Sequence, residues 1–310
     1  MSDQPIMNDA GTGPRDPEQL EATATTATAE IAPETHMGAV HLTVADLGRS
    51  IRYYQEQIGL EVVAQDDGVA TLGTGGRGLL VLTELPGAPP SRGHTGLYHF
   101  ALLVPERHDL ARWLAHAARD RVSLVGLSDH YVSEALYLRD PDHHGIEIYW
   151  DRPRDVWQDQ VDVRMTTEPL DVESLLGELD DPGSEPFDGL PGGTTMGHVH
   201  LQVAEIDSTV AFYRDLLGFS VMAQLGESAA FLAAGGYHHH LGANTWESRG
   251  ASPPPAGTAA LRHATIVLPD DAARDRVLDR LARAGHAVES GEDGAAVSDP
   301  SGNRLVLSTE

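Results

Sequence analysis

The stretch Val40-His41-Leu42-Thr43-Val44-Ala45-Asp46-Leu47 decides the fold, because a close variant returns later as Val199-His200-Leu201-Gln202-Val203-Ala204-Glu205-Ile206. Both phrases alternate like β-strands and lead into segments with the apolar spacing of a helix. Both helical segments end on a glycine, Gly59 and Gly218, which is a common position for a helix to stop. The chain therefore contains an internal repeat, and that repeat constrains the architecture before any single residue is considered.

A weaker repeat joins Leu97-Tyr98-His99-Phe100-Ala101 to Leu261-Arg262-His263-Ala264-Thr265, and both of these units later close on an Asp-Pro turn. Aligning the four phrases predicts a histidine at the same strand position in every unit. Each unit reads as a strand, a helix and three further strands, separated by glycine-rich turns. The sequence thus predicts an α+β protein of four βαβββ modules in two tandem pairs. Since one module alone exposes a sheet face, two modules must pair to enclose a cavity.

Composition restricts the class of protein. The 310 residues leave room for two domains, and the absence of both cysteine and lysine excludes disulfides, thiolate metal sites and Schiff-base lysines. A formal net charge of -26 argues against nucleic acid and anionic membranes as partners. No apolar run is long enough to span a bilayer, and the polar N-terminus does not resemble a signal peptide. We therefore expect a cytoplasmic protein; formation of a homo-oligomer stays open.

Local composition predicts the boundaries of the domains. Residues 1–35 contain too few large apolar side chains to offset the entropy of ordering, and we expect a disordered N-terminal tail. The first domain covers 36–155 and the second covers 195–310, with two modules in each. Residues 156–194 carry Asp, Glu, Pro and Gly in excess, which predicts a linker with one short helix at 172–176.

These modules carry a family resemblance. The phrase His-Leu-x-Val-Ala-Asp/Glu and the closing phrase Asp-Pro-Asp-x-x-Gly-Ile-Glu at 140–147 resemble the vicinal oxygen chelate superfamily of glyoxalases, bleomycin-resistance proteins and extradiol dioxygenases. Residues 96–100, 133–138 and 235–242 are more narrowly similar to bacterial catechol-2,3-dioxygenases. The resemblance covers 36–310. It implies an extradiol dioxygenase that opens the ring of a catechol-like or hydroquinone-like aromatic with Fe(II) and O2.

That chemistry needs a metal held by two imidazoles and one carboxylate, with other positions free for the substrate and dioxygen. His99 and Glu147 lie on the strands that open and close the second module, and alternation sends both side chains to the concave face. A half-buried carboxylate is costly unless it is paired or bound to a cation. The fourth module has Val306 in place of Glu147. The metal is therefore expected in the second module, with Fe(II) as the ion and Mn(II) as the alternative.

The third ligand is either His200 or His41. His41 would serve if the site lay between the two modules of one domain, and His200 would serve if the second and third modules paired across domains. His200 shares its strand face with His198 and Gln202, a polar row that does not suit an apolar core, whereas the neighbours of His41 are small. The residues favour this set of metal ligands: His99, Glu147 and His200.

Three further residues match catalytic positions of the extradiol family. His239 matches the acid–base histidine, because strand alternation separates it from His238 and His240, for which we expect solvent exposure or contact with a partner. His130 is placed like the histidine that stabilises bound oxygen. Tyr137 is placed like the tyrosine that hydrogen-bonds the substrate, although by residue type it is equally an ordinary strand aromatic.

Two other functions fit the same fold. A glyoxalase-like isomerase would need a second carboxylate on the last strand of the partner module, and neither 79–82 nor 238–241 contains one. A drug-sequestering protein of the bleomycin-resistance kind would use the cavity without a metal and would not need a buried Glu147. Of the remaining histidines, we expect His263 in the core and His143 and His144 on the surface.

Overall fold

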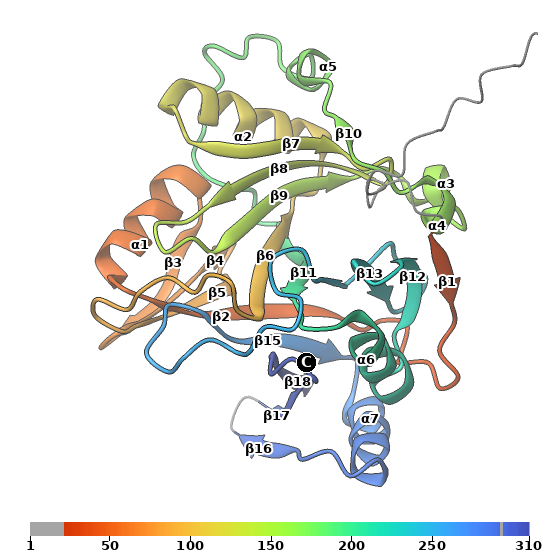
Figure 1. Cartoon of the computed structure of the whole chain (residues 1–310). Helices are drawn as coiled ribbons and strands as arrows, with labels where there is room; N and C mark the ends of the chain where they lie inside the picture. Colours follow the sequence, from red (N-terminus) through yellow and green to blue (C-terminus); the bar gives the residue numbers. More distant parts are fainter. Residues whose placement is uncertain (1–21, 292–293, 310) are drawn as a thin grey trace, which may run out of the picture.

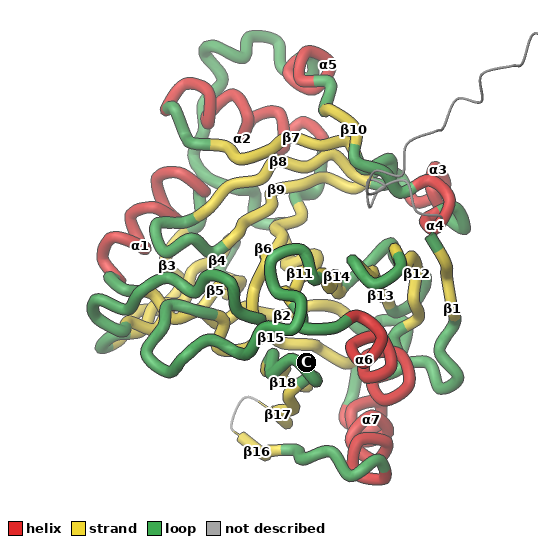
Figure 2. The backbone as a smooth tube through the Cα atoms, in the orientation of Figure 1, coloured by secondary structure: helices red, strands yellow, loops and turns green. Residues whose placement is uncertain are grey.

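Two large sheets form the framework of the protein, with the helices around them (Figures 1 and 2). The structure is a computed structural model and describes residues 22–291 and 294–309. The ten-stranded sheet has the order β1-β12-β13-β14-β11-β6-β9-β8-β7-β10. The eight-stranded sheet has the order β16-β17-β18-β15-β2-β5-β4-β3.

The strands of the ten-stranded sheet are β1 (Thr23–Thr25), β6 (Gly96–Leu103), β7 (Leu124–Asp129), β8 (Ser133–Arg139), β9 (Gly145–Asp151), β10 (Glu168–Pro169), β11 (Thr195–Gln202), β12 (Ser220–Leu225), β13 (Ala229–Ala233) and β14 (Leu241–Asn244). Those of the eight-stranded sheet are β2 (His36–Val44), β3 (Glu61–Asp66), β4 (Val69–Thr74), β5 (Arg77–Glu84), β15 (Leu261–Leu268), β16 (Glu289–Gly291), β17 (Gly294–Ser298) and β18 (Arg304–Thr309). The helices are α1 (Leu47–Tyr53), α2 (Arg107–Asp120), α3 (Arg154–Trp157), α4 (Val161–Arg164), α5 (Val172–Leu176), α6 (Ile206–Ala211) and α7 (Asp271–Arg283), with π-helical turns η2 (Tyr54–Ile58) and η3 (Phe212–Leu217).

The four predicted βαβββ modules are confirmed, and they pair across the two halves of the chain. The second module (β6–β9) joins the third (β11–β14) through the antiparallel strands β6 and β11. The first module (β2–β5) joins the fourth (β15–β18) through β2 and β15. Each sheet therefore takes one module from each half, so the predicted segments 36–155 and 195–310 do not build separate sheets. This cross-pairing is the arrangement on which the choice of His200 over His41 depended.

The first helix of each half is built in the same way. Asp46 accepts a hydrogen bond from the backbone N–H of Arg49 and caps α1, while Glu205 caps α6 through two backbone N–H groups. Both helices widen into a π-helical turn and end on the predicted glycines, with φ of 91° at Gly59 and 95° at Gly218. These are left-handed conformations, which glycine adopts without a steric cost.

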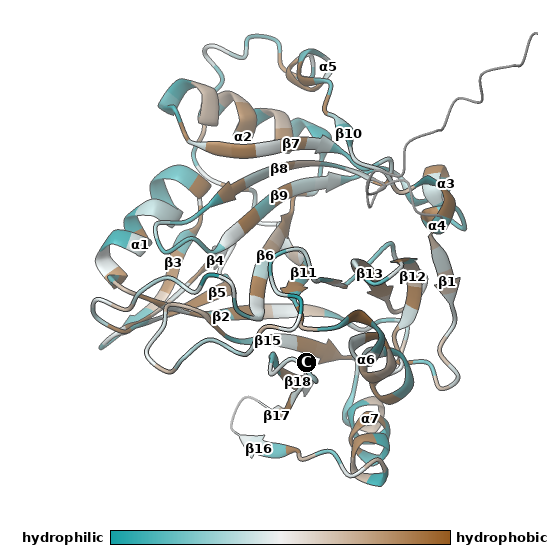
Figure 3. Cartoon of the chain, viewed as in Figure 1, coloured by the Kyte–Doolittle hydropathy of each residue, from teal (hydrophilic) through white to brown (hydrophobic). Residues whose placement is uncertain are grey.

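Buried tyrosines connect the modules within each half. The hydroxyl of Tyr54, from the first module, donates to the carboxylate of Asp140 in the second. Tyr213 of the third module makes the same contact with Asp299 of the fourth. The helices α2 and α7 each carry both hydrophobic and hydrophilic residues (Figure 3), and buried residues of α7 recur every four positions at Ala273, Val277 and Leu281, as expected for a helix that covers a sheet. None of the helices in the described residues is long and apolar enough to cross a membrane.

Three expectations about local exposure need correction. His144 is buried, with Nδ1 2.9 Å from the Asp140 carboxylate, whereas His143 is exposed as predicted. His238 and His240 are buried as well. The burial of His144 is explained by Asp140 of the Asp-Pro turn. Its carboxylate accepts a hydrogen bond from the buried Tyr54 and also gives the imidazole of His144 a buried partner.

The tail and linker also contain more structure than composition suggested. Residues 1–21 lie outside the described residues, but 22–35 include β1, which pairs with β12, and a buried Ile31, so the prediction of disorder is wrong there. The linker 156–194 holds α4, β10 and the predicted helix α5. Strand β10 extends the sheet beside β7. Short segments need little apolar surface of their own when they dock on an existing sheet edge.

Candidate metal centre

Strand register brings three ligand-type side chains to one point of the ten-stranded sheet. Ala101 on β6 pairs with Glu147 on the neighbouring strand β9 and with His198 on the other neighbour, β11. His99 lies two residues before Ala101, on the same face of β6. The small side chain of Ala101 leaves room in the middle, so His99, Glu147 and His198 can converge over it.

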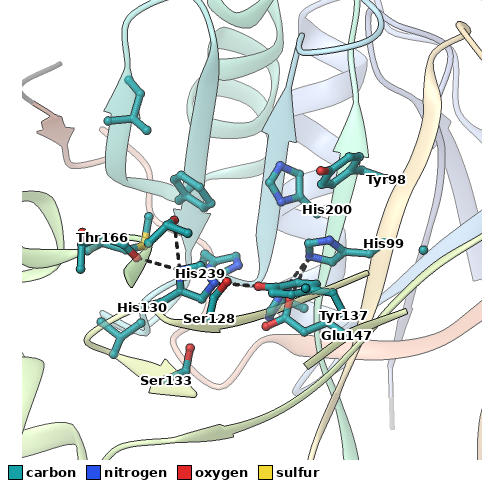
Figure 4. Close-up of a pocket in the computed structure, with 18 of the residues that line it drawn as sticks. Tyr98, His99, Ser128, His130, Ser133, Tyr137, Glu147, Thr166, His200 and His239 are labelled. Carbon is teal, nitrogen blue, oxygen red and sulfur yellow. Dashed lines mark hydrogen bonds and ion pairs between the residues drawn. The ribbon is translucent and has the colours of Figure 1, made fainter. Parts of the chain in front are cut away.

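The three side chains meet at hydrogen-bond distance. The Nε2 atoms of His99 and His198 each lie 3.0 Å from the same Glu147 oxygen, Oε2, and 3.3 Å from one another. Their ligand atoms all fall within 4.8 Å, and the three residues are buried. Figure 4 shows His99 and Glu147 pointing into the cavity. Two imidazole nitrogens and a carboxylate oxygen on one face are a donor set suited to a divalent transition metal with open positions.

The protonation states favour metal binding. Burial alone would raise the pKa of Glu147, but the imidazoles of His198 and His99 hold it well below its ordinary value. Burial lowers the pKa of His198. The folded site thus combines an ionised carboxylate with a neutral imidazole, the forms that bind a cation without first releasing a proton.

His200, the predicted third ligand, is not part of this cluster. It pairs with His99 across the β6–β11 junction, and its ring centroid is 4.9 Å from that of His99. His198 is the neighbour that stands opposite Glu147, with Ala101 between them. His198 and His200 are two residues apart on one face of β11, a separation of about 6.6 Å along the strand. The structure therefore replaces His200 with His198 as the candidate ligand.

The register also corrects the alignment of the modules. Phe100 pairs with Ile146 on the last strand of the second module, and Val199 pairs in the same way with Leu241 on the last strand of the third. The residues just before them, His99 and His198, are therefore equivalent. The expectation of a histidine at one strand position in all four modules was wrong. In the eight-stranded sheet the places of His99, Glu147 and His198 are taken by His263, Val306 and Ala39.

The eight-stranded sheet thus has no matching carboxylate at its centre. His41 instead stacks on His263 with ring centroids 3.8 Å apart. In the described part of the chain, one group of three or more metal-ligand side chains is found, and it is the cluster in the ten-stranded sheet. One metal centre per chain is the expectation that follows.

The cluster forms part of the wall of a cavity of about 810 Å³. This volume lies within the range that encloses drug-sized ligands, so a substituted aromatic ring fits. The cavity brings together all the predicted site residues except His41. The residues that line it next to the cluster include Tyr98, His130, Tyr137, His200, Phe231, His239 and Trp246.

His239 faces the cluster from the third module. Its triplet precedes β14 rather than lying on it, yet the predicted alternation holds, because His239 lines the cavity and His238 and His240 do not. The His239 ring centroid is 4.1 Å from that of His198. Its Nε2 atom is buried and has no hydrogen-bond partner among the described residues. Burial and then the neighbouring imidazoles keep the pKa of His239 well below its ordinary value, so the side chain is neutral.

His130 and Tyr137 form a second pair in the cavity wall. The backbone carbonyl of Thr166, 2.7 Å away, can only accept, so His130 carries its proton on Nδ1. His130 Nε2 then accepts from the hydroxyl of Tyr137 at 2.8 Å. Burial, and after it the charge of Glu147, raises the pKa of Tyr137 well above its ordinary value, so the phenol keeps its proton. Figure 4 shows His130 between Thr166 and Tyr137.

A model of the glyoxalase/bleomycin resistance protein/dioxygenase superfamily matches residues 36–148 and 195–307. The chain belongs to this superfamily. A catechol-2,3-dioxygenase of Bacillus subtilis (strain 168) is 44% identical over 273 residues, which cover 86% of this chain and 94% of that protein. The predicted resemblance to the superfamily and to catechol-2,3-dioxygenases is therefore confirmed.

Solved structures share the fold at low identity. A protein of Bacillus subtilis subsp. subtilis strain 168 superposes with a TM-score of 0.59 at 15% identity and covers 88% of this chain and 85% of its own. Glyoxalase I of Zea mays superposes with a TM-score of 0.54 at 17% identity, covering 88% of this chain and 92% of its own. At such identities the likeness shows the fold alone.

Proposed function

We propose that this protein is an extradiol ring-cleaving dioxygenase that acts on a catechol-like or hydroquinone-like aromatic with Fe(II) and O2. The observation that carries the proposal is the convergence of His99, His198 and Glu147 on the wall of a cavity that also holds His239. The name of the Bacillus subtilis relative supports the same chemistry.

The donor set fits the metal that this activity requires. His99, His198 and Glu147 would hold Fe(II), with Mn(II) as the alternative ion. When bound, the metal lowers the pKa of the diol oxygens and activates dioxygen for insertion into the ring. The fit rests on the shared geometry, since both imidazole nitrogens already face one carboxylate oxygen at 3.0 Å.

His239 supplies the proton acceptor. His239 lines the cavity and its Nε2 has no hydrogen-bond partner among the described residues, so we propose that Nε2 takes a proton from a hydroxyl of the substrate as the diol binds. Because its pKa is strongly lowered, the acquired proton is held weakly and is readily returned to the ring-opened product.

Tyr137 and His130 orient the substrate and protect the reaction. The Thr166 carbonyl fixes His130, and His130 in turn fixes the phenol of Tyr137, so both side chains reach the cavity already oriented. With its proton given to His130, the phenol oxygen of Tyr137 accepts a hydrogen bond from a hydroxyl of the aromatic substrate and so orients the ring. His130 would stabilise bound oxygen by donating from Nε2, which requires that Tyr137 turns its hydroxyl away and that Nε2 takes up a proton released by the diol.

The structure gives less support to a glyoxalase-like isomerase. Gly242 on β14 occupies the place of Glu147 in the partner module. A Cβ atom there would lie 2.7 Å from the His200 ring, so the second carboxylate of such an isomerase cannot occupy this position without moving His200. A drug-sequestering protein that uses no metal would not require a buried Glu147 with two imidazoles beside it.

Protein purified without oxygen tests the proposal. We expect about one Fe(II) or Mn(II) per chain and an oxygen-dependent yellow product from catechol or a substituted catechol. The same samples are offered a methylglyoxal–thiol adduct as a control substrate. Protein that binds no divalent metal, or that converts the thiol adduct and no diphenol, would overturn the proposed function.

A further inference from the structure

Behind the cavity wall, a chain of short hydrogen bonds leads from His239 to a carboxylate on β9. His239 Nδ1 lies 2.8 Å from Nδ1 of His238. Nε2 of His238 lies 2.7 Å from Oδ1 of Asp151. Asp151 ends the strand that carries Glu147, so one strand supports both the candidate metal ligand and the end of this chain.

With both imidazoles neutral, the chemistry of the three groups fixes the position of each proton. A carboxylate only accepts hydrogen bonds, so the contact with Asp151 requires the proton of His238 on Nε2. A neutral imidazole has one proton, which leaves Nδ1 of His238 as an acceptor. The 2.8 Å contact therefore requires His239 to donate from Nδ1. Its own Nε2 is then left with a free lone pair.

We propose that Asp151 is a positioning residue that sets the tautomer of His239 through His238. With Asp151 in place, the proton of neutral His239 stays on Nδ1 and the unpartnered Nε2 is the acceptor. Without it, His238 can carry its proton on Nδ1 and donate to His239, which moves the proton of His239 to Nε2. Nε2 then has no lone pair to offer to a substrate hydroxyl.

The surroundings hold this chain in one geometry. The hydroxyl of Tyr237 donates to the second Asp151 oxygen at 2.6 Å, and Tyr149 contacts that hydroxyl at 2.9 Å. The ring of His238 is fully buried and packs on Tyr237 with centroids 4.0 Å apart. Since protein atoms enclose His238, water cannot replace a lost partner, and the tautomers depend on Asp151.

Nitrogen shifts of the histidine rings test the tautomer directly. The full-length protein, labelled with a heavy nitrogen isotope in histidine and kept free of paramagnetic iron, gives long-range proton–nitrogen correlation spectra, and His239→Gln identifies the His239 signals. We expect a protonated Nδ1 and a bare Nε2 in the wild type, and a shift toward protonated Nε2 in Asp151→Asn. A protonated Nε2 in the wild type, or an unchanged tautomer in Asp151→Asn, would overturn the inference.

Turnover supplies a second readout, which rests on the proposed function. Asp151→Asn should keep stoichiometric metal and a KM near the wild-type value while kcat falls roughly 10²–10⁴-fold, the range for loss of a correctly placed proton carrier. In a His239→Ala background the same change should cost little, because both act through one group. Tyr237→Phe is the matched control, since it removes the donor to the other Asp151 oxygen and should cost much less.

The outcomes separate the two proposals. An equal loss from Asp151→Asn with and without His239 would show a merely structural role and overturn the inference. Wild-type protein with the expected tautomer but no ring cleavage of any diphenol would instead overturn the proposed function and leave the tautomer assignment standing.

Discussion

Replacing His198 and His200 one at a time separates the two candidate ligands. His198→Ala removes one of the two imidazoles that lie 3.0 Å from Glu147 Oε2 and leaves only His99 beside the carboxylate. Loss of a residue that merely orients a metal ligand weakens binding about 10–100-fold. Loss of the ligand itself should cost at least about 100-fold, or about 2.8 kcal/mol at 1.4 kcal/mol per factor of ten. His200→Ala removes a neighbour of the cluster, and we expect less than about a tenfold effect.

Anaerobic competition between the protein and a chromophoric Fe(II) chelator measures both affinities. Thermal unfolding of the metal-free variants provides the control. Loss of iron from His198→Ala counts as loss of a ligand only if the variant is shown to be folded. The reasoning is refuted if His200→Ala loses stoichiometric Fe(II) while His198→Ala keeps wild-type affinity.

Other variants test the rest of the site. His239→Ala should retain the metal and lower turnover roughly 10²–10⁴-fold, measured as oxygen uptake with catechol; a near wild-type rate would remove its assigned role. An isolated fragment of residues 36–155 lacks the strand that supplies His198, so it should not bind iron with native affinity in an equilibrium titration, and His41→Ala in the full chain should not change binding. Burial lowers the pKa of His240 to about 3, so the unfolded chain binds a proton there between that value and 6.5 and the folded protein does not. Stability should therefore fall as the pH drops from 6.5 toward 3, by at most about 1.4 kcal/mol per pH unit from this group. Denaturant titrations should show a flatter pH dependence for His240→Asn, and an unchanged slope would contradict the burial argument.

The sequence was sufficient to predict the four modules and two of the three candidate ligands, and its polar row favoured, between two alternatives, the pairing of the second module with the third. His99 and Glu147 could be found because they open and close one module and strand alternation sends both inward. The polar row on β11 also pointed to the strand and face that carry His198. It could not distinguish His198 from His200, because alternation is the same for both. Only the register against β6 separates them, and register depends on pairing between distant segments.

Other differences have the same origin in long-range contacts. Residues 22–35 have little apolar content, but β1 docks on β12 and Ile31 is buried. The burial of His238 could not be predicted from a histidine triplet, since it depends on Asp151, a residue 87 positions away. A strand can be recognised from its own residues, whereas a buried polar network requires knowledge of its partners.

Incorporation of isotopically labelled dioxygen tests the central claim most directly. Wild-type protein loaded anaerobically with Fe(II) is mixed with catechol and the labelled gas, and the product is analysed by mass spectrometry. An extradiol dioxygenase with its iron on His99, His198 and Glu147 places both oxygen atoms in a ring-opened semialdehyde, and His198→Ala forms none. The aldehyde oxygen exchanges with water, so the product is reduced to the alcohol at once. A product with no labelled atom, or a ring-opened product from His198→Ala at the wild-type rate, would contradict the account.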